Sequence, residues 1–205
     1  MNRRNDTAKR AVDIGLSVLA LPVLAAATAV VGPLIKREDD GPIFYTSQRL
    51  GRGMRPFTMY KFRTMRVNAP DIRNADGSTF SAEDDPRVTR VGRILRKTSV
   101  DELPQLLNVL RGDMSLVGPR PSPLGNESRY DDTFRRRFEV RPGITGYSQA
   151  LNRNDDSLEE RGRTDAYYVD NRSLMLDLSI MLRTVLRVVS TRSINRTPAQ
   201  SNRSA

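Results

Sequence analysis

The residues best suited to chemistry in this chain are two adjacent carboxylates, Asp101 and Glu102. Neither cysteine nor histidine occurs among the 205 residues. This excludes thiolate metal sites, a disulfide framework, histidine zinc chemistry and a histidine-based triad. Any acid or base must therefore be a carboxylate, a lysine or a tyrosine.

The same carboxylates also fit a purely structural role. Ser99-Val100-Asp101-Glu102 matches the S-x-x-E capping box, in which the glutamate returns a hydrogen bond to the backbone of the N-cap residue. Carboxylates in a first turn also favour the helix dipole. We expect a helix from about Ser99 to Arg111, ended by Gly112. Pro104 would lack its bond to Val100 in such a helix, so the start stays open, and so does the choice between capping and catalysis.

Three short motifs place arginine or lysine beside a rigid turn. They are Tyr60-Lys61-Phe62-Arg63-Thr64-Met65, Gly118-Pro119-Arg120-Pro121 and Arg141-Pro142-Gly143-Ile144-Thr145-Gly146. Proline fixes φ and glycine lets backbone amides approach a ligand closely, so such turns can aim a guanidinium and nearby N–H groups at phosphate oxygens. With an Asp-Glu pair in a membrane-attached chain, they suit a charged diphosphate substrate whose other half is lipid.

Membrane attachment is indicated by the run from Ile14 to Ile35, which has no charged residue and is long enough to span a bilayer. Lysine and arginine flank it on both sides, and Pro22 removes one helical hydrogen bond inside it. We therefore expect a helix that enters the membrane, breaks near Pro22 and returns. The alternatives are a plain span and a cleaved signal peptide, the latter suggested by the small residues Ala25, Ala26 and Ala27.

The remaining pattern predicts an α+β, mostly helical fold with surface amphipathic helices. Ile43 to Gln48 and Phe57 to Phe62 predict a small β-hairpin, and the polar stretch Val67 to Pro86 predicts a surface loop. Val88 to Lys97 is patterned as an amphipathic helix whose basic face suits an anionic membrane surface or simply solvent. A long amphipathic helix is expected from Leu174 to Val189, with an apolar stripe more typical of a core than of membrane contact.

This pattern divides the chain into three parts. We expect a re-entrant membrane helix hairpin, a cytosolic and membrane-associated catalytic domain, and a polar tail that is disordered, at 1–40, 41–190 and 191–205. The length and composition are those of one folded domain.

The charge balance limits the partners. There are 34 lysines and arginines against 24 aspartates and glutamates, a formal net charge of +10. Such a chain is drawn to nucleic acid, anionic lipid or phosphorylated small substrates. The apolar run and the aromatic content of 6% argue against nucleic acid. A membrane-bound scaffold that recruits partners without catalysis is a further alternative.

Together these segments resemble the monotopic phosphoglycosyl transferases, also called bacterial sugar transferases, over roughly Lys9 to Arg187. Besides the three cationic motifs, the likeness rests on Gly41-Pro42-Ile43-Phe44 with Gln48, Arg49 and Gly51, on Ser99-Val100-Asp101-Glu102-Leu103-Pro104-Gln105-Leu106, on Gly112-Asp113-Met114-Ser115-Leu116-Val117 before Gly118, and on Tyr167-Tyr168. Members often have serine before the break proline, where this chain has Leu21.

The resemblance implies an enzyme on the cytosolic face of the bacterial inner membrane. Such an enzyme transfers a sugar 1-phosphate from a UDP-sugar to undecaprenyl phosphate and releases UMP, the first membrane step of glycoconjugate assembly. The implied cofactor is Mg2+, and the implied partners are the UDP-sugar, the polyprenol phosphate and anionic membrane lipid, with no nucleic acid. A homodimer is allowed.

The resemblance also assigns roles to residues. Asp101 is the nucleophile and a metal ligand, Glu102 assists it, and Pro22 marks the membrane break. The resemblance makes Arg96, Arg120 and Arg141 candidate phosphate binders, and the cationic motifs add Lys61, Arg63 and Gly143 as further candidates. Attack by a carboxylate splits one displacement into two and gives an acyl phosphate. The alternative within the same family is direct attack by the lipid phosphate, with Glu102 as the base and no covalent intermediate.

Overall fold

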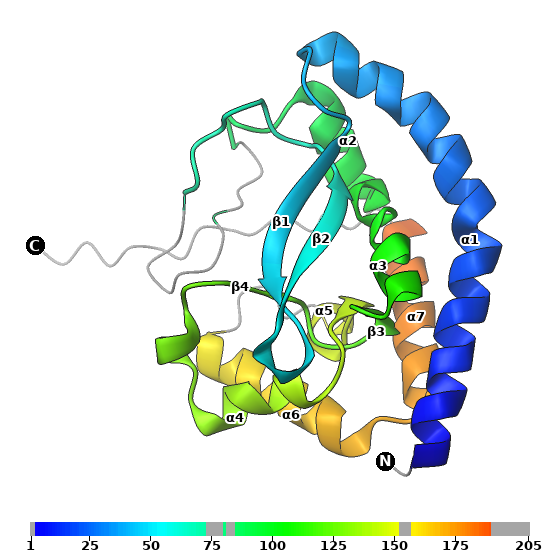
Figure 1. The fold of residues 1–205 in the computed structure, drawn as a ribbon, viewed down its shortest axis with the longest axis vertical. Helices are drawn as coiled ribbons and strands as arrows, with labels where there is room; N and C mark the ends of the chain where they lie inside the picture. Colours follow the sequence, from blue (N-terminus) through cyan, green and yellow to red (C-terminus); the bar gives the residue numbers. More distant parts are fainter. Residues whose placement is uncertain (1–2, 73–79, 81–84, 152–156, 190–205) are drawn as a thin grey trace, which may run out of the picture.

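The computed structural model describes residues 3–72, 80, 85–151 and 157–189, so the tail at 191–205 that was expected to be disordered lies outside the described residues (Figure 1). The fold is α+β and mostly helical, as predicted. Its helices are α1 Arg3–Glu38, α2 Arg90–Thr98, α3 Gln105–Arg111, α4 Asp132–Arg135, α5 Tyr147–Ala150, α6 Leu158–Asn171 and α7 Leu174–Val189. Short 3-10 turns are η1 Arg52–Met54, η2 Val100–Glu102, η3 Glu127–Arg129 and η4 Arg136–Glu139. The strands are β1 Phe44–Leu50, β2 Pro56–Phe62, β3 Ser115–Val117, β4 Ser122–Pro123 and β5 Gly143–Thr145.

Helix α1 runs without interruption through Pro22 and Pro33. The predicted break near Pro22 is therefore wrong for this structure. Each proline removes one backbone hydrogen bond, but a long helix can absorb that loss by bending instead of ending. Figure 1 shows such a curved path, with α1 running along one side of the molecule and over its upper end. Whether the two ends of the apolar segment face the same side of a membrane stays a prediction.

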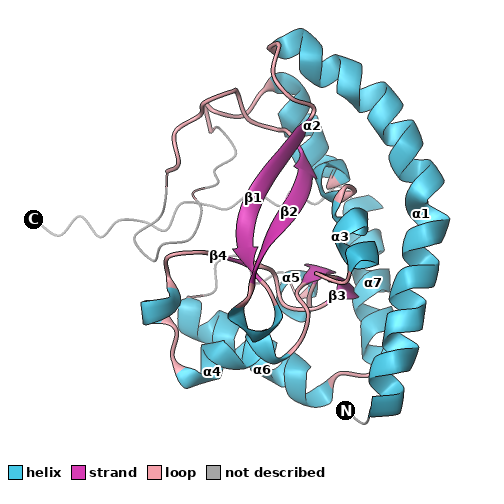
Figure 2. Cartoon of the chain, viewed as in Figure 1, coloured by secondary structure: helices cyan, strands magenta, loops and turns pink. Residues whose placement is uncertain are grey.

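The predicted hairpin is confirmed by the antiparallel pair β1 and β2, shown in Figure 2. Its register runs from Phe44 opposite Phe62 to Leu50 opposite Pro56. Strand β4 adds to the free edge of β1 and completes a three-stranded sheet in the order β2-β1-β4. A second, parallel pair joins β3 to β5. The β3–β5 pair brings the Gly118-to-Pro121 and Arg141-to-Gly146 motifs together, and the Gly143 N–H donates to the Pro119 carbonyl at 2.9 Å.

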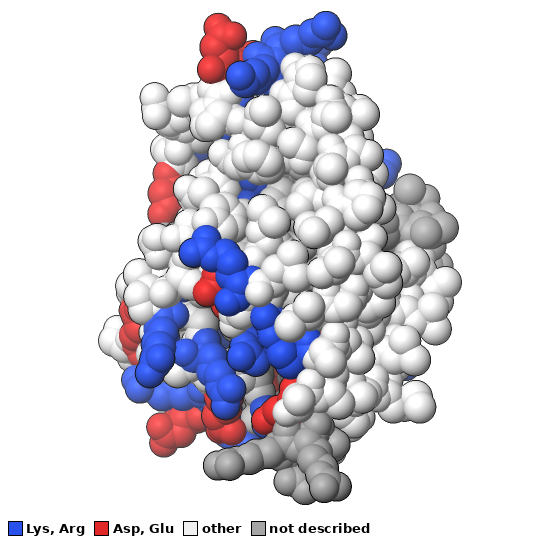
Figure 3. Space-filling view, turned by 45° about the vertical axis from the view of Figure 1, so that its right-hand side comes forward, with Lys and Arg blue, Asp and Glu red and all other residues white. Residues whose placement is uncertain are grey.

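One face of the molecule is apolar and exposed, and it is formed by α1 and α7. Figure 3 shows a broad uncharged stretch on this side, with lysine and arginine gathered toward its lower end and a smaller charged group at its top. The exposed large hydrophobic residues on the two helices are Val12, Ile14, Leu16, Val18, Leu19, Val23, Val30, Leu34, Leu174, Met175, Leu178, Leu182, Val185 and Leu186. Among the described residues, Asp6–Glu38 is the one helix long and apolar enough to cross a membrane. This face is consistent with membrane association.

The apolar stripe of α7 departs from expectation. Among the large hydrophobic side chains of α7 whose burial is described, only Ile180 is fully buried, and the stripe from Leu174 to Leu186 is largely exposed. The interpretation of this stripe as core is therefore wrong for most of its length. The side of α7 that carries Asp177 is the one that meets α1, through the 2.6 Å ion pair with Lys9, and within the described residues the opposite side is exposed.

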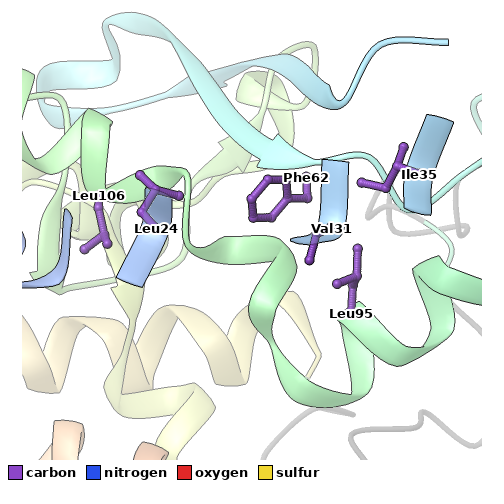
Figure 4. Close-up of a cluster of buried hydrophobic side chains, with 6 residues drawn as sticks. All are labelled: Leu24, Val31, Ile35, Phe62, Leu95 and Leu106. Atoms are coloured by element: carbon purple, nitrogen blue, oxygen red, sulfur yellow. The ribbon is translucent and has the colours of Figure 1, made fainter. Parts of the chain in front are cut away.

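The principal core packs α1 against the elements that carry the acidic pair. Leu24, Val31 and Ile35 of α1 meet Phe62 of β2, Leu95 of α2 and Leu106 of α3, as Figure 4 shows. Burial of these side chains holds α1, α2, α3 and β2 together as one unit, because apolar area removed from water is the main stabilising contribution to a fold.

Candidate active site

The acidic pair lies in a short turn between two helices. Helix α2 has Thr89 as its N-cap residue, and the Thr89 hydroxyl accepts the Gly92 N–H at 2.9 Å. Its C-cap residue is Ser99, where the backbone is left-handed with φ of 57°. Turn η2 then carries Asp101 and Glu102, and α3 begins only at Gln105.

This arrangement corrects the predicted helix from Ser99 and the predicted capping box. The Ser99 side chain makes no cap hydrogen bond, and the Glu102 N–H bonds only to the Ser99 carbonyl at 3.2 Å, as in a 3-10 turn. Pro104 has no N–H and so cannot continue a helix begun at Ser99. The positive φ at Ser99 costs on the order of 1–3 kcal/mol, a strain tolerated where surrounding structure fixes the backbone.

Glu102 is held on both carboxylate oxygens. Lys61 Nζ lies 2.7 Å and Arg120 Nη2 3.2 Å from Oε1, and the Gln105 side-chain amide donates to Oε2 at 3.0 Å. Burial alone would raise the pKa of Glu102, and it is the largest single influence. The combined effect of Lys61, Arg120 and Gln105 outweighs it and lowers the pKa to about 2. Glu102 is therefore a fixed anion near neutral pH.

Asp101 is placed differently although it is the next residue. It is 7% exposed, and its nearest cation is Lys61, whose Nζ lies 3.8 Å from Oδ2. Its carboxylate accepts no hydrogen bond from the residues that the structure describes. Burial raises the pKa of Asp101, with the charge of Glu102 acting in the same direction and Lys61 against it. Asp101 is thus the less stabilised of the two anions. Its oxygens are not engaged by hydrogen-bond donors of the described residues, so they are available to act as a nucleophile.

Two of the predicted arginines lie beside the pair. Arg96 donates from Nε to Thr64 Oγ1 at 3.0 Å, and its positive charge acts on Asp101. The Arg120 side chain contacts Glu102 but is still 51% exposed. Its remaining N–H groups can therefore donate to a ligand. The buried Arg137 donates to the Arg120 carbonyl at 2.7 Å and so fixes the backbone at Arg120.

The other predicted phosphate binders have different partners. Arg63 is buried in an ion pair with Asp39 at the end of α1. Arg141 donates from Nε to the Gly112 carbonyl at 2.9 Å, at the far end of α3 from the acidic pair. The Gly143 N–H is used by the Pro119 carbonyl at 2.9 Å. The structure does not bring Arg63 and Arg141 to the acidic pair, and it leaves Gly143 no amide to offer.

Gly143 instead has a packing role. A Cβ atom at this position would lie 2.1 Å from the Gly118 nitrogen, closer than any side chain allows. Only glycine permits the two loops to meet backbone to backbone. The contact fixes the turn that carries Arg120.

Two residues were missed in the sequence, Gln105 and Asn108. Asn108 is fully buried, accepts the Tyr60 N–H at 3.0 Å and donates to the Thr58 carbonyl at 2.7 Å. This clamp holds α3 against β2 and so keeps Lys61 next to Glu102. The sequence signal for them was their spacing. Gln105 and Asn108 are three positions apart, so they share one face of α3, and this face is buried.

The fold and site define a class of protein. The site combines a buried and a partly buried carboxylate with a lysine and two arginines, and the chain carries a long apolar helix. This combination suits a phosphate-ester reaction at a membrane surface. The chain matches the family model for bacterial sugar transferases over residues 4–191. It therefore belongs to the bacterial sugar transferase family and is a transferase enzyme.

Three relatives illustrate the similarity. An uncharacterized sugar transferase, EpsL, of Bacillus subtilis is 41% identical over 189 residues, which cover 92% of this chain and 91% of EpsL. The UDP-glucose:undecaprenyl-phosphate glucose-1-phosphate transferase of Caulobacter vibrioides is 42% identical over 198 residues, with 88% and 72% covered. The galactosyl transferase CpsE of Streptococcus agalactiae is 42% identical over 190 residues, and the match covers 89% of this chain but 42% of CpsE.

Proposed function

We propose that this enzyme transfers a sugar 1-phosphate from a UDP-sugar to undecaprenyl phosphate and releases UMP, through a covalent phosphosugar intermediate on Asp101. The observation that carries the proposal is the asymmetry of the acidic pair. Glu102 accepts hydrogen bonds on both oxygens, whereas Asp101 is buried beside the same lysine and accepts none from the described residues.

The proposed reaction has two displacements. An Asp101 carboxylate oxygen attacks the phosphorus that bears the sugar, the bond from that phosphorus to the bridging oxygen breaks, and UMP leaves with the electron pair. An oxygen of undecaprenyl phosphate then attacks the same phosphorus and breaks its bond to Asp101, which regenerates the carboxylate. Each step exchanges one P–O bond for another, so no proton has to be removed from a nucleophile.

Glu102 then acts by position and charge. A carboxylate whose pKa is about 2 stays ionised near neutral pH, so it is poorly suited to the alternative role of a general base. It holds Lys61 between the two carboxylates, and Lys61 in turn reduces the repulsion that a dianionic diphosphate would meet at Asp101. Arg120 and Arg96 are the proposed diphosphate binders because they flank the pair and arginine matches phosphate oxygens in a bidentate manner.

The residues present fit a magnesium ion. Magnesium commonly binds through one or two carboxylates together with substrate phosphates and water, so a cage of several acidic residues is not needed. Within the described part of the chain no group of three or more acidic residues forms such a cage. Both Glu102 oxygens have donors, which leaves Asp101 as the carboxylate that would hold the ion. When bound, magnesium neutralises charge on the diphosphate.

The proposed location is the cytosolic face of the bacterial inner membrane. The apolar face of α1 and α7 would lie in lipid, and the basic α2 would lie against anionic headgroups, with Ile94 exposed on its surface. The polyprenol tail can then stay in the bilayer while its phosphate reaches Asp101. The name of the Caulobacter relative gives undecaprenyl phosphate as the acceptor, which supports placing the active site at a membrane surface.

The test is a reaction without acceptor. Purified enzyme with magnesium and a panel of UDP-sugars should release one UMP per active site for the correct donor, and the peptide containing Asp101 should gain the mass of a sugar phosphate. Direct attack by the lipid phosphate predicts UMP only after undecaprenyl phosphate is added and no mass gain. That result would exclude the covalent route while keeping the transferase.

A further inference from the structure

A second cationic region lies at the opposite end of α3 from the acidic pair. It is a shallow recess that is open to solvent. The recess is lined by the start of α1, the turn after β1, strand β3 and the segment that ends at Arg141. Helix α3 has 7 residues and so spans about 10 Å, with the acidic pair before its first residue and the recess at its last.

The lining carries more positive than negative charge. Its cations are Lys9, Arg10, Arg52, Arg141 and Arg172, and its acids are Asp6, Asp13 and Glu139. Each acid already has a partner in the protein. Asp6 lies 3.8 Å from Arg172, Glu139 lies 3.4 Å from Arg136, and Asp13 accepts the Leu116 N–H at 3.1 Å.

Three of the guanidiniums have no carboxylate partner in the part of the chain that the structure describes. Arg10 donates to the Val109 and Leu110 carbonyls at 2.6 and 3.1 Å, and Arg141 donates from Nε alone, to Gly112. Arg52 is exposed and forms no ion pair with the acids that the structure describes. The pKa of Arg141 is lowered by burial and then by the charges of Arg10 and Arg52, against the smaller opposite effects of Asp13 and Asp6, so the repulsion among the three cations is only partly offset. An anion in the recess would remove that repulsion.

A buried hydroxyl in the same recess lacks a partner. Ser115 is 2% exposed, its Oγ has no hydrogen-bond partner among the described residues, and the residue lines the recess. Buried hydroxyls nearly always have a partner, because leaving one unpaired costs free energy. A ligand oxygen beside Ser115 would satisfy it.

The position of the recess indicates which anion. It takes in α1 from Asp6 to Asp13, and the apolar run begins at Ile14, so it sits where α1 changes from polar to apolar. Lys9 joins this end of α1 to Asp177 of α7, next to the exposed Met175 and Leu178. Figure 3 shows lysine and arginine gathered at the lower end of the uncharged face. An anionic group carried on apolar chains would match the cationic recess with its charge and the exposed apolar side chains of α1 and α7 with its chains.

From this the geometry points to a phosphate-binding site at Arg10, Arg52, Arg141 and Ser115, separate from the acidic pair, that takes the headgroup phosphate of an anionic phospholipid. Phosphate oxygens accept from guanidinium Nη groups and from a serine hydroxyl. The acyl chains lie on the exposed apolar faces of α1 and α7. The site does not depend on the proposed reaction.

The test measures binding to the full-length protein in neutral detergent, without UDP-sugar. Calorimetry and thermal unfolding are recorded with dihexanoyl phosphatidylglycerol below its micelle concentration, with dihexanoyl phosphatidylcholine, and with inorganic phosphate. Phosphatidylglycerol should bind and raise the unfolding temperature, and phosphatidylcholine should bind more weakly because its choline is cationic. Equal stabilisation by inorganic phosphate would keep the phosphate site and assign it to a free anion. Failure of all three probes to bind would overturn the proposal.

Two variants identify the residues. Arg52→Glu, at an exposed side chain, should weaken phosphatidylglycerol binding about tenfold or more, because a charge-assisted hydrogen bond is replaced by repulsion. Ser115→Ala should weaken binding without lowering the unfolding temperature of the ligand-free protein, since the lost hydroxyl has no partner there. Arg163→Gln, an exposed arginine on α6, is the matched control and should bind as wild type does. Equal affinity of wild type, Arg52→Glu and Ser115→Ala would show that the lipid binds elsewhere.

Discussion

The side-chain amide of Gln105 donates to Glu102 Oε2 at 3.0 Å, the oxygen that Lys61 does not touch. Gln105 is 1% exposed, so this contact is made in the interior and fixes the glutamate from inside the fold. Hydrogen bonds in a low-dielectric site are stronger than in water, and losing one leaves its partner unsatisfied. Gln105 is therefore a positioning residue for the acidic pair.

Replacing Gln105 tests this role. Gln105→Leu keeps the approximate volume but removes the donor, so we expect kcat to fall about tenfold or more with little change in KM for the UDP-sugar, because Glu102 loses its orientation and not its charge. Gln48→Leu, on the exposed hairpin, is the control. Wild-type kcat in the Gln105→Leu enzyme would mean that Lys61 and Arg120 position the glutamate without help.

Glu102 itself should show a pH-dependent stability effect. Its folded-state pKa is lowered to about 2, so the ionised carboxylate stabilises the fold above its ordinary pKa and that contribution is lost as pH falls toward 2. Glu102→Gln should unfold at a lower temperature than wild type near pH 7, and the difference should shrink steadily between about pH 4.5 and pH 2. Thermal unfolding across this range checks it. A constant difference would mean that packing, not charge, accounts for the loss.

The four predicted arginines should separate into two groups. Arg96→Lys and Arg120→Lys should reduce kcat/KM because lysine keeps the charge but loses bidentate contact with phosphate. Arg63→Lys should instead lower the unfolding temperature, through its buried pair with Asp39, and leave activity per folded molecule unchanged. Arg141→Lys should leave KM for the UDP-sugar unchanged, since Arg141 contacts the Gly112 carbonyl and not the acidic pair. A raised KM in Arg141→Lys would return it to the donor site.

Sequence reasoning succeeded where a pattern is local. The hairpin, the helix around Val91 and Leu95 and the helix from Leu174 each follow from periodicity that one segment carries by itself. It could not say which cationic residues lie together, because their partners come from distant segments. Nothing near Arg63 indicates Asp39, and nothing near Arg141 indicates the end of α3, so the sequence did not separate the residues beside the acidic pair from the others.

The α1 helix shows a different limit. Proline at position 22 correctly signals a lost hydrogen bond, but whether the backbone then breaks or bends is decided by packing of Leu24, Val31 and Ile35 against α2, α3 and β2. Those contacts span long sequence separations. The exposed stripe of α7 was misread for the same reason, since an amphipathic pattern does not say whether the apolar side meets protein or lipid.

Membrane topology can be tested independently of the helix path. Single cysteines introduced at Asn5 and Asp40, in a chain with no native cysteine, should both react with a membrane-impermeant maleimide from the cytosolic side. Basic residues at both ends of the apolar run are the reason. Labelling from opposite sides would establish a spanning helix. Pro22→Leu should shift the population toward that spanning form, because it restores the missing hydrogen bond.

The decisive variant is Asp101→Asn. Asparagine keeps the size of the side chain but cannot form an acyl phosphate, so UMP release and the sugar-phosphate mass on this peptide should both be lost. The folded-state pKa of Asp101 is raised, which means that ionised Asp101 costs stability above its ordinary pKa and that lowering the pH through the folded pKa relieves the cost.

The Asp101→Asn protein should therefore unfold at the same or a higher temperature than wild type at pH 7, and its advantage should vanish as pH falls and wild-type Asp101 takes up its proton. Lost activity with unchanged or raised stability separates a nucleophile from a structural carboxylate. A fully active Asp101→Asn enzyme, checked by mass for deamidation back to aspartate, would refute the assignment of Asp101 as the nucleophile.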